Sequence, residues 1–95
     1  MIAVDTNILV YAHRTDIREH LPAREALERL TATANHWAIP LPCLHEFYAV
    51  VTGPAFGRNR TPPERAFDTL RVWATHPGCR LLSESESHLA TLGAL

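Results

Sequence analysis

Short apolar runs alternate along the chain with longer segments of helical periodicity. Three runs of three or four mainly apolar residues are typical of buried strands, namely 2–4, 36–39 and 79–82. Apolar residues at helical spacing predict helices between and after these runs, namely 7–13, 16–30, 42–52, 62–75 and 84–95. Apolar strands separated by helices form a parallel sheet covered on both faces. The pattern therefore predicts one α/β domain over residues 1–95, a three-layer sandwich.

Capping residues predict where two of these helices begin. Asp16 and Glu19 stand at the N-cap and N3 positions of the second helix, although a start nearer Leu21 also fits. Thr61 and Glu64 form the same kind of pair before the fourth helix, with a proline at its first position. Both pairs predict that an oxygen of the first residue accepts a bond from the helix backbone.

The large aromatic residues are interpreted as core. Trp37 lies in the second strand, and Phe67 and Trp73 lie on the apolar stripe of the fourth helix. This placement leaves no aromatic platform for stacking nucleic-acid bases.

Composition excludes several classes of protein. The chain is 46% hydrophobic and 20% charged with a formal net charge of −1, so no overall field favours nucleic acid or a membrane surface. All nine basic residues are arginines, which fits a GC-rich genome or, alternatively, phosphate and carboxylate partners. Two cysteines, Cys43 and Cys79, form no disulfide framework and fit a reducing cytoplasm. No segment reads as a signal peptide or a transmembrane helix.

Asp5 is the first candidate for chemistry. It ends the first predicted strand just before a helix, at the sheet edge where ligands bind in open α/β folds. A carboxylate there could hold a hard cation such as Mg²⁺. The alternative is that Asp5 only caps the following helix.

Glu46 is the second candidate. Its neighbours three and four residues away, Pro42, Cys43, Ala49 and Val50, are apolar or nearly so. A charged group among them needs a cation or an arginine partner. A rim glutamate paired with arginine is the simpler interpretation, but two acids that converge on one metal are more informative than either alone.

Several stretches of the sequence resemble the PIN domains, in particular the VapC toxins of bacterial toxin–antitoxin pairs. The resemblance covers nearly the whole chain in matching order and is carried by residues 2–12, 36–40, 44–47, 50–52 and 61–62. It implies a Mg²⁺- or Mn²⁺-dependent endoribonuclease that cleaves RNA and is held inactive by a cognate antitoxin.

The resemblance also implies roles for individual residues. Asp5 matches the first acid of the family's metal site and Glu46 matches the second. Thr6 and Asn7 match the polar residues that follow and orient the first acid.

The family pattern continues beyond the stretches that match here. It adds a helix beginning in a His-Asp pair, a strand and an Asp-rich loop, which supply a third and often a fourth acid. Four other acids of this chain are poor replacements for that third or fourth acid, namely Asp16, Asp68, Glu84 and Glu86. The PIN-like fold is therefore expected to be incomplete at the C-terminus. Strand 2–4 is expected to be an exposed apolar edge, with self-association as a homodimer or an antitoxin compensating for it.

Two further functions compete with the nuclease. A catalytically dead PIN remnant would bind only antitoxin or a second copy. A phosphotransferase with an aspartyl nucleophile commonly needs a second acid two residues after the first, where this chain has Asn7.

Weaker candidates complete the survey. Arg14 and Arg18 could meet phosphate, be solvated or pair with the capping acids nearby. The basic loop 57–60 could touch RNA phosphate or an antitoxin, or simply be solvated. Two short motifs hold zinc-type ligands, Cys43-x-His45 and His76-x-x-Cys79, with a low expectation of zinc binding.

Overall fold

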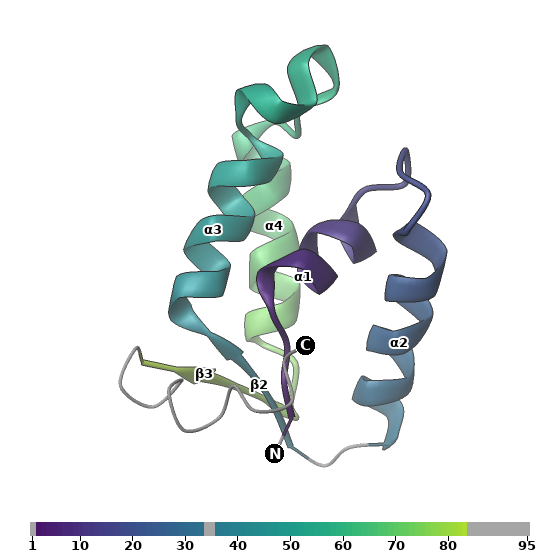
Figure 1. The fold of residues 1–95 in the computed structure, drawn as a ribbon. Coiled ribbons are helices and arrows are strands. Elements are labelled where there is room, and N and C mark those ends of the chain that lie inside the picture. Colours follow the sequence, from purple (N-terminus) through teal and green to yellow (C-terminus); the bar gives the residue numbers. More distant parts are fainter. Residues whose placement is uncertain (1, 34–35, 84–95) are drawn as a thin grey trace.

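A parallel sheet forms the base of the fold. The computed structural model describes residues 2–33 and 36–83 (Figure 1). Its three strands lie in the order β1-β2-β3 and all pair in parallel, with Trp37 opposite Ile2 on one side and Cys79 on the other. Their bounds are β1 (Ile2–Ala3), β2 (Trp37–Pro40) and β3 (Cys79–Leu82). The predicted α/β fold with a parallel sheet is confirmed.

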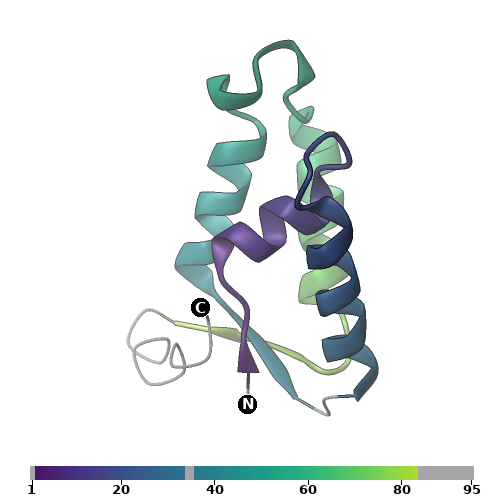
Figure 2. The ribbon, with the colours of Figure 1, turned by 45° about the vertical axis from the view of Figure 1, so that its right-hand side comes forward.

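The helices form a continuous layer (Figures 1 and 2). Helix α1 contacts α2 and α3, and α4 packs beside α3. Both crossovers step across the sheet in the same direction, so right-handed connections place the described helices on one face. Within the described ranges, two of the three predicted layers are therefore present, the sheet and one layer of helices. The helices are α1 (Thr6–His13), α2 (His20–Thr33), α3 (Leu41–Val51), the 3₁₀ helix η1 (Pro54–Asn59) and α4 (Pro63–Ala74).

The core lies where this helix layer meets the sheet. Its largest fully buried side chains are Trp37, Phe47, Leu9, Ile39 and Val51. The rings of Phe47 and Trp73 pack edge to face with centroids 5.0 Å apart, which joins α3 to α4.

Phe67 does not belong to this core. Its side chain is 57% exposed and packs edge to face against Tyr48, whereas Ala66 is the fully buried residue of α4. The prediction for Phe67 is wrong because α3 covers only a narrow strip of α4, and the small Ala66 occupies it.

Both predicted capping pairs are also wrong. Helix α2 begins at His20, near the alternative start, and Asp16 bonds to Arg14 instead of capping it. Helix α4 begins at Pro63, so its N-cap position falls on Pro62, and the Thr61 hydroxyl instead bonds to His13 and accepts a bond from Arg14. A guanidinium that must satisfy its donors in the interior competes for the same side-chain oxygens.

The expected apolar edge is only partly exposed. In the described part of the chain β1 pairs with β2 alone, and Ile2 is 50% exposed. Ala3 and Val4, however, are buried. The predicted helix at 84–95 lies outside the described residues. No helix within the described ranges is long and apolar enough to cross a membrane.

Candidate functional site

Asp5 lies at the junction between β1 and α1. Its backbone is extended, and its Oδ1 accepts a 3.0 Å hydrogen bond from the Ile8 N–H. Asp5 is therefore the N-cap of α1, as the alternative of a helix-capping aspartate predicts. Its side chain is half-buried, and no hydrogen bond to Oδ2 is found among the described residues. One oxygen thus orients the carboxylate while the other remains available to a ligand.

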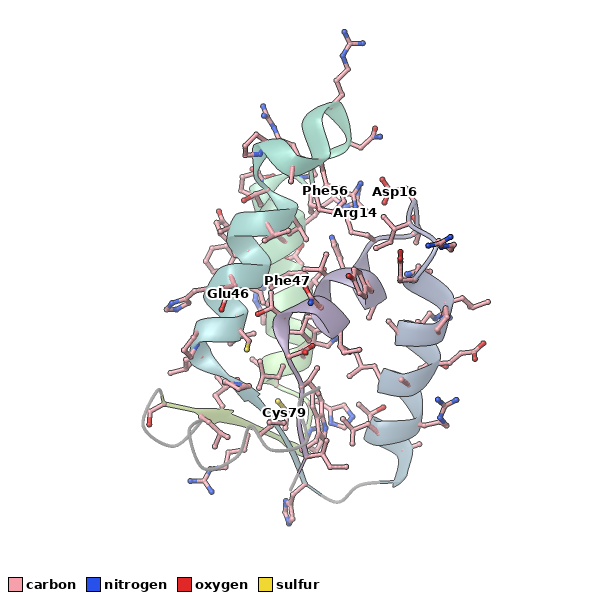
Figure 3. The ribbon with its side chains drawn as sticks, viewed as in Figure 1. Arg14, Asp16, Glu46, Phe47, Phe56 and Cys79 are labelled. Atoms are coloured by element: carbon pink, nitrogen blue, oxygen red, sulfur yellow. The ribbon has the colours of Figure 1, made fainter. Side chains whose placement is uncertain are left out.

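Glu46 lies on α3, the helix that packs beside α1. It is exposed, and the described part of the chain offers it no ion pair or hydrogen bond. Figure 3 shows it level with the first turn of α1. The interpretation of Glu46 as a rim glutamate paired with arginine therefore has no support within these residues.

Thr6 and Asn7 form the first turn of α1. Thr6 is half-buried and Asn7 is exposed. The contact that orients Asp5 comes from the Ile8 backbone, and neither side chain donates to Asp5 in the described structure. Both side chains remain close to Asp5 along the chain and are available to a bound group.

No third acid joins this pair within the described ranges. They contain no group of three or more Asp, Glu, His or Cys side chains that could hold a metal ion. Asp16 is held by Arg14, and Asp68 lies 3.6 Å from Arg71 on the same helix. Two carboxylates are nevertheless a known donor set for Mg²⁺, which keeps several waters and binds substrate phosphates as well.

The two zinc-type motifs have other roles or none. Cys43 and Cys79 are not disulfide-bonded, and burial raises the pKa of the Cys79 thiol. The His76 Nδ1 accepts hydrogen bonds from the Gly78 N–H at 3.1 Å and the Trp37 indole N–H at 3.4 Å. His76 thus helps to close the turn before β3.

Arg14 has a structural role that goes beyond pairing with a nearby acid. It is only 8% exposed, so it is not a solvated arginine, whereas its bonds to Asp16 confirm the alternative that it pairs with a nearby acid. Its guanidinium donates to Asp16, to the Asn59 carbonyl and to Thr61, and lies 4.1 Å from the centre of the Phe56 ring (Figure 3). Phe56, Asn59 and Thr61 come from the segment between α3 and α4, so Arg14 fastens the end of α1 to that segment.

Comparison with known proteins relates this arrangement to a family. The chain matches the family model for the PIN domain over residues 2–95. It is 36% identical over 88 residues to a VapC ribonuclease of Mycobacterium bovis and, equally, to ribonuclease VapC43 of Mycobacterium tuberculosis. Each alignment covers 93% of this chain and 60% of the relative. The chain thus spans about three fifths of the length of these curated relatives.

Proposed function

The chain belongs to the PIN-domain family, and we propose that it provides Asp5 and Glu46 to the metal site of a Mg²⁺- or Mn²⁺-dependent endoribonuclease of the VapC type. The observation that carries the proposal is the exposed Glu46 carboxylate, without a partner in the described chain, on the helix beside the one that Asp5 caps. The position of Glu46 on α3, which packs beside α1, is what distinguishes it from other exposed carboxylates.

Each side chain has a separate role in this proposal. The Ile8 N–H holds one oxygen of Asp5, so the other points in a fixed direction toward the ion. Glu46 supplies a second hard oxygen ligand. When bound, the divalent ion activates water and neutralises charge that develops on the RNA phosphate. Thr6 and Asn7, at the start of α1, hydrogen-bond to the phosphate or to the attacking water.

The partners and the cellular compartment that we propose are based on the relatives and on the described fold. The similarity to VapC ribonucleases supports a cognate antitoxin as partner, and the edge position of β1 supports self-association as a homodimer. The unbridged Cys43 and Cys79 suit a reducing cytoplasm.

Metal binding and RNA cleavage test the proposal on the 95-residue chain. Mn²⁺ binding, followed by electron paramagnetic resonance, is expected to be lost in Asp5→Asn and Glu46→Gln. Asparagine caps helices as well as aspartate, so Asp5→Asn removes the charge and keeps the fold. Glu28→Gln is the matched control, since Glu28 lies on α2 and pairs with Arg24.

Cleavage of single-stranded RNA should require the divalent ion and the same two carboxylates. Cleavage that persists in Asp5→Asn, or in a chelator, would contradict the proposal. Failure to bind Mn²⁺ and to cleave RNA, together with retained binding of an antitoxin, would identify the chain as a non-catalytic PIN remnant.

A further inference from the structure

A polar pocket lies at the end of α1 that is remote from Asp5. It has a volume of about 370 Å³ and is formed by the end of α1, the segment before α4 and the first turn of α4. Helix α1 has eight residues, so the pocket and Asp5 are separated by about 12 Å of helix. The residues that give the pocket its charge are His13, Arg14, Asp16, Arg60 and Arg65.

The pocket carries an excess of positive charge. Asp16 neutralises Arg14 through paired hydrogen bonds. Arg60 and Arg65 are exposed, and neither guanidinium has an ion pair within the described residues. Two guanidinium groups from different elements are thus available at one polar pocket. Their fork-shaped donors match the oxygens of a phosphate.

The imidazole of His13 reports the same excess. Burial lowers its pKa, and the charges of Arg14 and Arg65 lower it further, as does His20 to a smaller extent. Asp16 opposes this shift but does not cancel it. Positive charge therefore dominates at the His13 ring, which borders the pocket, and an anion there would be stabilised.

We propose that this pocket binds a backbone phosphate of the RNA strand, a short distance along the strand from the phosphate at Asp5 and Glu46. This inference rests on the proposed nuclease function and extends it to how the substrate is held. The same helix, α1, begins at Asp5 and ends at the pocket, so a strand that follows α1 reaches both. The mainly polar lining favours a phosphate over a peptide, which would need apolar anchors.

RNA binding without divalent ions tests the pocket separately from catalysis. A fluorescein-labelled single-stranded RNA of twelve nucleotides is titrated in a chelator with wild type and with the double variant Arg60→Ala/Arg65→Ala. Loss of the one phosphate contact should reduce the dependence of log affinity on log salt by about 0.7. Between 50 and 200 mM salt, wild type should then lose about 2.6-fold more affinity than the variant.

The matched control is Arg24→Ala/Arg71→Ala, which removes the same charge from exposed arginines away from the pocket. An unchanged salt dependence in the pocket variant, or an equal change in the control, would overturn the proposal. So would binding of an acidic peptide that needs Arg60 and Arg65 when RNA binding does not. Mn²⁺ binding by the pocket variant should equal that of wild type, so a failure at Asp5 and Glu46 is distinguishable from a failure here.

Discussion

The two ends of α1 hold charged side chains in opposite situations. At its start, one carboxylate oxygen of Asp5 accepts the bond from the Ile8 N–H. Glu46, on the adjacent helix α3, has no partner in the described chain. Past its end, Arg14 is buried, donates to three residues and stacks on Phe56. Asp5 and Glu46 can therefore bind a ligand, whereas the donors of Arg14 are already used within the fold.

Desolvation explains this difference. A buried guanidinium is stable only when its donors are paired, so the fold surrounds Arg14 with acceptors. An exposed carboxylate such as Glu46 keeps its water and costs the fold nothing. Substitution of Arg14 should therefore change stability most, whereas removal of the charge of Asp5 or Glu46 should mainly change ligand binding.

The largest expected effect comes from Arg14→Ala. It removes the bonds that the guanidinium donates to Asp16, the Asn59 carbonyl and Thr61, together with its contact with Phe56. We expect the free energy of unfolding in urea to fall by about 3 kcal/mol. Arg24→Ala, which breaks an exposed pair with Glu28, should cost about 0.5 kcal/mol or less. Equal effects of the two variants would show that Arg14 is not the fastening point.

The same contrast explains how much of the molecule could be predicted. The strands, most of the helices and the candidates Asp5 and Glu46 could be predicted from local patterns and from short motifs that resemble the family. The bonds from Arg14 to Asn59 and Thr61 could not, because these residues lie 45 and 47 positions away and no spacing rule links them. Thr61 resembles a helix cap in sequence, but the buried guanidinium takes its oxygen.

A smaller effect on stability is expected at the other end of α1. Asp5→Ala removes the cap of α1 and should lower the free energy of unfolding by about 1 kcal/mol. Asp5→Asn keeps the cap and should leave stability within about 0.3 kcal/mol of wild type. Thermal and urea unfolding of both variants measure the difference. A large loss in Asp5→Asn would mean that the charge of Asp5, and not only its cap, supports the fold.

The smallest effect is expected from pH, because only one proton on the half-buried ring of His13 is involved. Burial, followed by the charges of Arg14 and Arg65, lowers the pKa of His13 in the folded chain. The unfolded chain therefore takes up this proton first, near pH 6.5. The His13 contribution to stability is complete above that pH and is lost as the pH falls from about 6.5 toward the folded pKa.

The difference in pH dependence of unfolding between wild type and His13→Gln, measured between pH 8 and 5, isolates this contribution from those of the other histidines. Asp16, whose pKa its hydrogen bond to Arg14 lowers, titrates below that range. His13→Gln should remove the corresponding part of the pH dependence. Arg65→Ala should raise the pKa of His13 and reduce the loss, because it removes a positive charge beside the ring. Identical pH profiles for wild type and Arg65→Ala would show that the charge of Arg65 does not act on His13. The electrostatic link between α4 and the end of α1 at the basic pocket would then be absent.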